Sequence, residues 1–398
     1  MMTKANLSFY LDIDCHQVNH DEELVCGDVF LMKRVKEEGR TILILSDGMG
    51  SGVKANVLAT LTASMAYNFT VGNYDVQKTA EIIMNTLPVC SERGVSYSTF
   101  TIIDIDDNGV IKIVEYDNPH VLTLRGGKIL DLRWEKFALE GEKNRGKILR
   151  TCTFQAEVED RMLFWSDGIM QSGIGTANQP YGWGQQGVID FVLRSVGAIP
   201  DISSTLLAKK IVNMAVINDG GKPKDDSSCG VVYFRVPRSL LFISGPPFTE
   251  DMDEEFAERV RRFKGKRIIA GGTTSEIIAR ELKYKFKKEM LVLDVNQPPI
   301  SQLESIDLVT EGIITLGYVS QILEGYKSDT KLGRSGAEQI VKLFLESDEI
   351  LFLVGTCVNQ AHQDPNMPIE LEIRRSVIKR IANLLESKFL KEVSLEFI

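Results

Sequence analysis

The stretch Ser46–Gly52 (SDGMGSG) decides how the fold of this chain is predicted. It follows the apolar run Thr41–Ser46, a predicted strand, and precedes a predicted helix over Lys54–Phe69. A carboxylate at the end of an apolar strand has its direction fixed by the sheet, and glycines let the backbone approach a ligand closely. Taken alone, the stretch is also consistent with a flexible bend or an anion-binding helix start.

Further acidic residues stand at strand ends in the same part of the chain. Asp28 opens a predicted strand, Asp167 follows another, and Asp225 and Asp226 precede the last one. A single Asp-Gly pair after a strand is more often a turn than a ligand, but four such sites in one domain are improbable as coincident turns. Converging carboxylates stay ionised only if cations lie among them, and such hard oxygen ligands select Mg²⁺ or Mn²⁺ over zinc.

The cysteines offer a weaker alternative metal site. Cys15, His16, His20 and Cys26 lie close together in the sequence, but their spacing matches no standard zinc module. The chain has six cysteines without a CxxC pair, which is typical of reduced, mostly buried thiols.

The order of predicted elements favours a layered α+β fold for residues 1–237. The helix over Lys54–Phe69 carries Val57, Leu58, Leu61, Met65 and Phe69 as its apolar positions, and a second helix covers Val76–Leu87. Predicted strands stand before and after these helices, and two later helices and a final strand follow. This order predicts a β-sandwich of two antiparallel sheets flanked by helices, an α-β-β-α arrangement. The predicted strands are Ser8–Ile13, Asp28–Val35, Thr41–Ser46, Tyr97–Ile105, Val110–Tyr116, His120–Leu124, Lys128–Arg133, Thr151–Val158, Arg161–Trp165 and Cys229–Val236.

After Val236 the pattern changes to alternating strands and helices. This predicts a smaller α/β domain over residues 238–398, and a length of 398 residues suits two domains. We expect a strand at Met290–Asp294, a helix at Thr310–Tyr326, and a solvated helix end at Lys283–Lys288. A regulatory or docking role is the working hypothesis for this accessory domain.

Composition excludes several classes of partner. The chain has 46 Lys and Arg against 55 Asp and Glu, a formal net charge of −9, so no overall field draws it to nucleic acid or to an anionic membrane. No apolar run approaches the roughly 20 residues that span a bilayer, and the first residues contain no apolar signal-peptide core. We therefore expect a cytoplasmic protein without nucleic-acid or membrane partners.

The ordered acidic motifs resemble the metal-dependent PPM (type 2C) serine/threonine phosphatases, and more closely their bacterial branch typified by stage II sporulation protein E (SpoIIE). The resemblance covers about residues 1–237 and implies two divalent cations, Mn²⁺ or Mg²⁺. By that likeness Asp47 bridges both metals, the Gly48 carbonyl helps to hold one, and Asp28 binds a metal directly or through its water. Asp167 and Asp225 match the ligands of the other metal, and Asp226 is a lesser candidate.

Two positions depart from the eukaryotic pattern. Met49 stands where those members tend to have a histidine thought to assist the leaving group, and no clear match to their phosphate-gripping arginine is found near the N-terminus. The leaving-group acid and the phosphate contact therefore stay unassigned.

The resemblance implies a hydrolase of the signalling type. Metal-activated water would cleave phosphoserine or phosphothreonine, and the partner would be a phosphorylated regulatory protein of the anti-sigma-factor antagonist type. Two alternatives stay open: a phosphatase of a small phosphorylated metabolite, and a metal-binding pseudo-phosphatase scaffold that acts through its C-terminal domain. A thiol phosphatase is poorly supported because none of the six cysteines lies in a recognisable phosphate-binding loop of the Cys-x5-Arg type.

Overall fold

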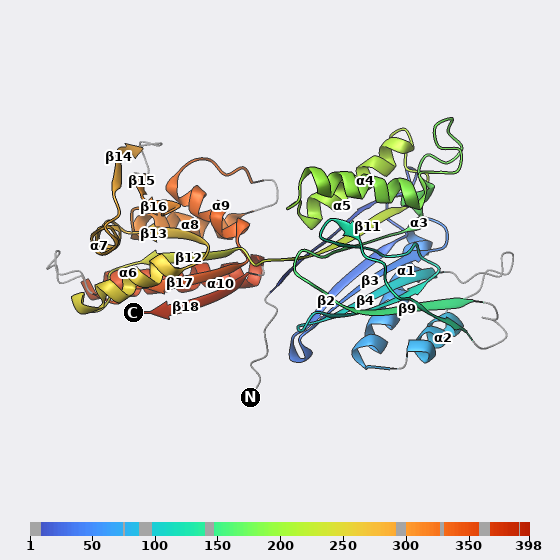
Figure 1. Ribbon diagram of the computed structural model, residues 1–398, viewed down its shortest axis with the longest axis horizontal. Helices are drawn as coiled ribbons and strands as arrows, with labels where there is room; N and C mark the ends of the chain where they lie inside the picture. The colour runs from blue at the N-terminus through green and yellow to red at the C-terminus, as the bar shows by residue number, and fades with distance from the viewer. Residues whose placement is uncertain are drawn as a thin grey trace. The chain divides into compact units, whose positions relative to one another are not determined.

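The chain divides into two compact units, Met1–Val236 and Pro237–Ile398 (Figure 1). Each unit has its own sheets and its own hydrophobic clusters. The computed structural model describes residues 9–74, 76–86, 98–139, 147–291, 300–326, 330–357, 367–389 and 391–398.

The first sheet of the first unit has six antiparallel strands in the order β2-β3-β4-β5-β9-β8. A tight turn joins β4 to β5, closed by a hydrogen bond of 2.9 Å from the Gly109 N–H to the Asp106 carbonyl. Its strands are β2 (Val29–Val35), β3 (Arg40–Gly48), β4 (Ser98–Asp106), β5 (Val110–Tyr116), β8 (Glu135–Ala138) and β9 (Ile148–Gln155). A short 3-10 helix, η1 (Lys36–Glu38), links β2 to β3.

The second sheet has five antiparallel strands in the order β1-β11-β10-β6-β7. The first strand of the unit pairs with its last along their whole length, from Tyr10 opposite Arg235 to Val18 opposite Ser227. The strands are β1 (Tyr10–Val18), β6 (Leu122–Arg125), β7 (Lys128–Ile129), β10 (Arg161–Trp165) and β11 (Ser227–Arg235). This pairing puts β11, which is buried along its whole length, between β1 and β10.

Alternating side chains sort this unit into four layers. Leu43 and Leu45 of β3 belong to the cluster between the two sheets, whereas Ile42 and Ile44 belong to the cluster beneath the first pair of helices. These helices are α1 (Gly52–Val71) and α2 (Val76–Thr86), and α4 (Gly184–Ala198) and α5 (Ser204–Asn218) cover the second sheet. Figure 1 shows α4 and α5 on one side of the strands and α2 on the other. The predicted mixture of antiparallel sheets and helices is confirmed.

Helix α1 turns a different face to the sheet from the one that its large residues suggest. Val57 and Leu61 are 59% and 43% exposed, and the positions against the sheet carry small residues such as Ala55 and Ala59. A Cβ atom on Gly48 would collide with the backbone carbonyl of Ala55, which shows how closely the helix approaches β3. Of the predicted apolar positions, Val57 and Leu61 therefore lie outside the packed face, whereas Met65 and Phe69 pack against the cluster beneath the helix.

The second unit contains a seven-stranded sheet in the order β14-β15-β16-β13-β12-β17-β18. The five strands from β16 to β18 in this order are parallel, and β15 and β14 extend the sheet antiparallel. The strands are β12 (Ser239–Ser244), β13 (Lys266–Ala270), β14 (Phe286–Leu291), β15 (Ile300–Leu303), β16 (Leu308–Thr310), β17 (Glu349–Val354) and β18 (Glu392–Phe397).

Helices cover both faces of this sheet. One cluster contains buried residues of α8, α9 and α10, and another contains those of α6 and α7. Their bounds are α6 (Asp253–Arg262), α7 (Gly272–Leu282), α8 (Ile313–Gly325), α9 (Gly336–Glu346) and α10 (Met367–Phe389), with a 3-10 turn η3 (Glu250–Met252) before α6. Within the described ranges, no helix has the length and apolar character that crossing a bilayer requires.

Several predicted elements of this unit need correction. The helix expected from Thr310 begins at Ile313, because Leu308–Thr310 completes a strand and Gly312 separates the two. Lys283–Lys288 is not a helix end: Lys283 adopts a left-handed conformation that stops α7, and β14 begins at Phe286. Of the strand expected at Met290–Asp294, only its first two residues are described, and they end β14; the rest lies outside the described residues.

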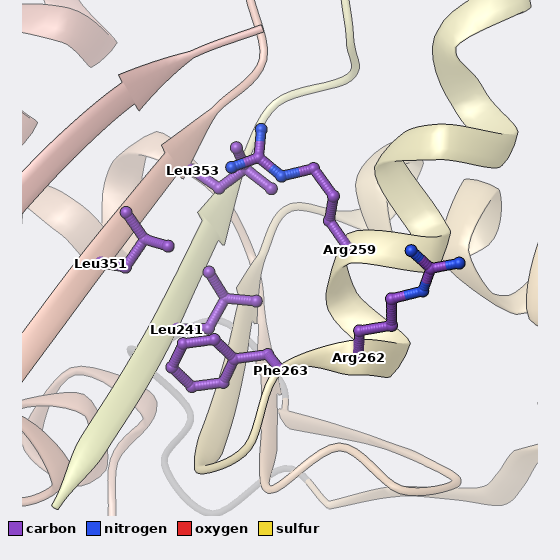
Figure 2. A pocket seen from close by; sticks show the side chains of 6 residues that line it. All are labelled: Leu241, Arg259, Arg262, Phe263, Leu351 and Leu353. Atoms are coloured by element: carbon purple, nitrogen blue, oxygen red, sulfur yellow. The ribbon is translucent and has the colours of Figure 1, made fainter. Parts of the chain in front are cut away.

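A hollow of about 250 Å³ lies between α6 and the sheet of this unit (Figure 2). Leucines of β12 and β17 form its floor, and α6 and the residue after it supply the wall. Its arginines are neutralised, since Arg259 forms an ion pair with Glu396 and Arg262 forms one of 2.6 Å with Glu258. The lining residues are Leu241, Arg259, Arg262, Phe263, Leu351 and Leu353.

Candidate metal centre

Strand register brings the predicted acidic residues together in pairs. In the first sheet Val29 pairs with Ser46, so Asp28 and Asp47 are the next positions along neighbouring strands. In the second sheet the end of β10 lies beside the start of β11, where the Ser166 N–H donates to the Ser228 carbonyl at 3.0 Å. Each sheet therefore presents its carboxylates at the ends of adjacent strands.

The residues after β10 form a helix that the sequence does not reveal. Asp167 is the first residue of the five-residue helix α3 (Asp167–Gln171), and the Gln171 side-chain amide donates to Asp167 Oδ2 at 2.6 Å. A Cβ atom on Gly168 would collide with the main-chain oxygen of Asp226. The Asp-Gly sequence therefore serves close contact between α3 and the loop that carries Asp225 and Asp226.

Burial and the charges of neighbouring carboxylates raise the pKa values of the acidic side chains. Burial raises the pKa of Asp28 to about 7, an effect that a hydrogen bond from Ser228 opposes and the charge of Asp226 reinforces. Burial also raises the pKa of Asp47 well above its usual range, and so do the charges of Asp28 and Asp167. Charges act this strongly only over short distances, so the three carboxyl groups are close neighbours.

The two acidic residues before β11 have different surroundings. Burial and then the charge of Asp167 raise the pKa of Asp225 to about 6. Asp226 is 3% exposed and accepts a hydrogen bond of 3.1 Å from the His20 backbone N–H. A Cβ atom on Gly27 would lie 2.6 Å from Asp226 Oδ2, so this oxygen faces the backbone beside Asp28. Asp225 thus belongs with Asp167, and Asp226 with Asp28.

The chemistry of these side chains fits divalent cations. Asp28 Oδ1 and Asp226 Oδ2 are buried and have no hydrogen-bond partner within the described part of the chain, an unfavourable situation that a cation would relieve. All the donors are oxygens, as Mg²⁺ and Mn²⁺ prefer. No group of three or more His, Cys, Asp or Glu residues is already arranged to hold a metal ion in the described ranges. We give more weight to the donor chemistry, because Asp28 Oδ1 and Asp226 Oδ2 are buried without partners where the carboxylates gather.

The alternative zinc site shows no group of three metal-binding side chains either. All of its residues lie in the described part of the chain: Cys15, His16, His20 and Cys26. Burial raises the pKa of the Cys15 thiol well above its usual range and that of Cys26 to about 12, so neither is a ready thiolate. His20 instead contributes its backbone N–H to Asp226.

Two residues near the carboxylates are not among the site residues predicted from the sequence. Ser228 donates from Oγ to Asp28 Oδ2 at 2.6 Å, and Gln17 donates from Nε2 to Ser228 Oγ at 2.9 Å. Ser228 lies within the Asp225–Ser228 motif, so its proximity could have been suspected. Gln17 carries no such signal, since it is 211 residues away from Ser228 in sequence.

Comparison with known proteins gives one family match. Residues 37–235, half of the chain, match the family model described as stage II sporulation protein E (SpoIIE). No protein of curated function matches the sequence.

Solved structures give weaker likenesses. The phosphatase domain of SpoIIE from Bacillus subtilis is 16% identical, covers 57% of this chain and 94% of its own, and has a TM-score of 0.44. The RsbU and RsbW domains of a Mycobacterium tuberculosis protein are 16% identical over 63% of this chain and 67% of their own, with a TM-score of 0.44. RsbX in complex with magnesium is 16% identical over 56% of this chain and 95% of its own, with a TM-score of 0.39. Structural similarity at this level of identity and TM-score carries no information about the substrate.

Proposed function

This chain belongs to the stage II sporulation protein E (SpoIIE) family of phosphoprotein phosphatases, and we propose that it hydrolyses phosphoserine and phosphothreonine with two divalent cations, Mn²⁺ or Mg²⁺. The observation that carries the proposal is the mutual influence of four carboxyl groups from two sheets. Asp28, Asp167 and Asp225 all act on the pKa of Asp47, which is itself raised by burial. Such a group of acids is costly to bury unless it binds cations.

The proposed roles follow the position of each ligand. Asp47, which responds to both Asp28 and Asp167, would bridge the two cations, and the Gly48 carbonyl would help to hold one of them. Asp167 and Asp225 would hold the second cation, because they are each other's charged neighbours. Asp28 would bind directly or through a water molecule, and Asp226, whose Oδ2 lies beside Gly27, is the lesser candidate.

When bound, the cations would lower the pKa of a water molecule that attacks phosphorus and would screen the phosphate charge. The protein's own contribution is to hold the carboxylates in fixed directions. Strands β2 and β3 do this for Asp28 and Asp47, and helix α3 does it for Asp167, whose Oδ2 is held by Gln171.

The substrate that we propose is a phosphorylated regulatory protein of the anti-sigma-factor antagonist type. The second unit, residues 237–398, would recruit or regulate, since a phosphoseryl group alone offers little for a phosphatase to recognise. Preference for a small phosphorylated metabolite over phosphoprotein would contradict this substrate while leaving the chemistry intact.

The test is hydrolysis of a phosphoserine peptide and of an aryl phosphate in the presence of Mn²⁺. Activity should require the metal and should fall at least 100-fold in Asp47→Asn. Asp190→Asn, an exposed aspartate on α4 that pairs with Gln186, is the matched control and should keep full activity. Activity that survives chelation, or an active Asp47→Asn protein, would contradict the proposal.

A further inference from the structure

A chain of two hydrogen bonds runs from the second sheet to Asp28. Gln17 and Ser228 lie directly opposite each other on the antiparallel strands β1 and β11. Gln17 Nε2 donates to Ser228 Oγ at 2.9 Å, and Ser228 Oγ donates to Asp28 Oδ2 at 2.6 Å. An amide nitrogen can only donate, so the single hydroxyl proton of Ser228 is directed to the carboxylate.

The backbone of Asp28 is held by the same glutamine. Gln17 Nε2 lies 3.4 Å from the Asp28 main-chain oxygen, so one amide group contacts both the residue and the serine that orients its side chain. Ser228 is fully buried and Asp28 is 3% exposed, so the bond between them is shielded from bulk solvent. The position of the carboxylate is therefore set by the strand pairing of β1 and β11.

The two carboxylate oxygens of Asp28 differ in their hydrogen bonding. Oδ2 is held by Ser228, whereas Oδ1 is buried and has no hydrogen-bond partner among the residues that the structure describes. Fixing one oxygen of a carboxylate restricts the direction of the other. Oδ1 is thus the oxygen of Asp28 that is left to meet a cation.

We propose that Gln17 and Ser228 are positioning residues that hold Asp28 with Oδ1 directed at a bound cation. The inference rests on the proposed function, because it assumes a cation at that centre. Groups that orient metal-binding side chains commonly contribute 10–100-fold to metal affinity. Without Gln17 and Ser228, the Asp28 carboxylate would be free to rotate toward other hydrogen-bond donors, and the cation would lose a preformed ligand.

The experiment measures Mn²⁺ binding to the full chain by titration calorimetry, independently of any hydrolysis. Ser228→Ala should weaken Mn²⁺ affinity 10–100-fold, and Gln17→Leu should weaken it less, since the serine hydroxyl remains. Ser204→Ala is the matched control: Ser204 is equally buried and donates at 2.6 Å to the Asp12 main-chain oxygen, away from the carboxylates. The Mn²⁺ affinity of the Ser204→Ala protein should stay within twofold of that of the wild type.

A double mutant separates a connected chain from two independent contacts. If Gln17 acts mainly through Ser228, the loss of Mn²⁺ affinity in the double mutant should be smaller than the sum of the two single losses, with only the Gln17 contact to the Asp28 main-chain oxygen left to remove. At saturating Mn²⁺ the kcat of Ser228→Ala should return close to that of the wild type, because a positioning residue does not touch the substrate.

Three results would overturn the inference: a Ser228→Ala affinity within twofold of the wild type, an equal loss in Ser204→Ala, or full additivity in the double mutant. Gln17→Leu is the variant to rely on if Ser228→Ala does not fold, and unchanged affinity in it would be equally decisive. A wild-type protein that binds no Mn²⁺ would overturn the proposed function as well, whereas a protein that binds Mn²⁺ but hydrolyses nothing would overturn only the function.

Discussion

Asp28 and Asp47 occupy opposite positions at the ends of neighbouring strands of the first sheet, because Val29 pairs with Ser46. Asp167 opens helix α3 after β10 of the second sheet, and its charge raises the pKa of Asp47. Burial also raises the pKa values of Asp28 and Asp47. Without cations these acids are therefore costly to ionise, and the behaviour of the centre can be tested through binding, pH and packing.

Cations should stabilise the folded protein measurably. A ligand that binds only the native state at 100 times its Kd adds about 2.7 kcal/mol to the free energy of unfolding. We expect Mn²⁺ to raise the unfolding temperature, a chelator to reverse the rise, and Asp47→Asn to abolish it. Differential scanning calorimetry checks this, with Asp190→Asn as a variant that should keep the full shift. An equal shift in Asp47→Asn would place the cations elsewhere.

Without cations, stability should decline as pH rises. Asp28 keeps its proton up to a pKa of about 7 in the folded chain, against 3.8 for an unperturbed aspartate. Between these values the folded state binds a proton that the unfolded state has released, so the free energy of unfolding falls from pH 4 to pH 7. Urea unfolding in chelator at several pH values measures the decline. It should be smaller in Asp28→Asn and in saturating Mg²⁺, and a rise in stability over this range would refute it.

Close packing of α1 against β3 should make Gly48 intolerant of a side chain. A Cβ atom there would collide with the Ala55 backbone, so Gly48→Ala should lower the free energy of unfolding by about 1–3 kcal/mol. Gly197→Ala in α4 is the control, since a Cβ atom at that position meets nothing within 4 Å. It should be neutral, or stabilising by up to about 1 kcal/mol through helix propensity. Equal effects of the two substitutions on the urea midpoint would argue against the packing described.

The orientation of α1 predicts opposite sensitivities for two neighbouring residues. Ala59 is fully buried, so Ala59→Leu should cost about 1–3 kcal/mol through overpacking. Val57 is 59% exposed, so Val57→Ala should change stability by no more than about 0.5 kcal/mol. Chemical unfolding of the two variants decides the matter, and a larger loss in Val57→Ala would mean that the helix turns its other face to the sheet.

Much of the first unit could be predicted because its signals are local. The strand Val110–Tyr116 and the strand Arg161–Trp165 were predicted with the bounds that the structure shows. Alternating apolar residues such as Ile42 and Leu43 fill both sides of β3, and that pattern is visible without any partner. The metal roles of Asp28, Asp47, Asp167, Asp225 and Asp226 remain predictions that the experiments above test.

Other features could not be predicted because they depend on distant parts of the chain. The buried residues of α1 are small and mostly alanines, and the ordinary rule that large apolar side chains point inward fails there for Val57 and Leu61. Strands β15, β16 and β18 are short or carry polar residues such as Ser301, Glu392 and Glu396, so they resemble loops until a neighbouring strand pairs with them.

The sequence by itself determined which residues have the chemistry: carboxylates at strand ends, in an order that marks the family. The tertiary structure decided which of them meet. Strand register sets Asp28 beside Asp47, the two sheets bring Asp47 to Asp167, and Gln17 reaches Ser228 across 211 residues of sequence. Burial then raises the pKa of Asp28 to about 7. Pairing and desolvation are properties of the folded chain, because both depend on neighbours that are remote in sequence.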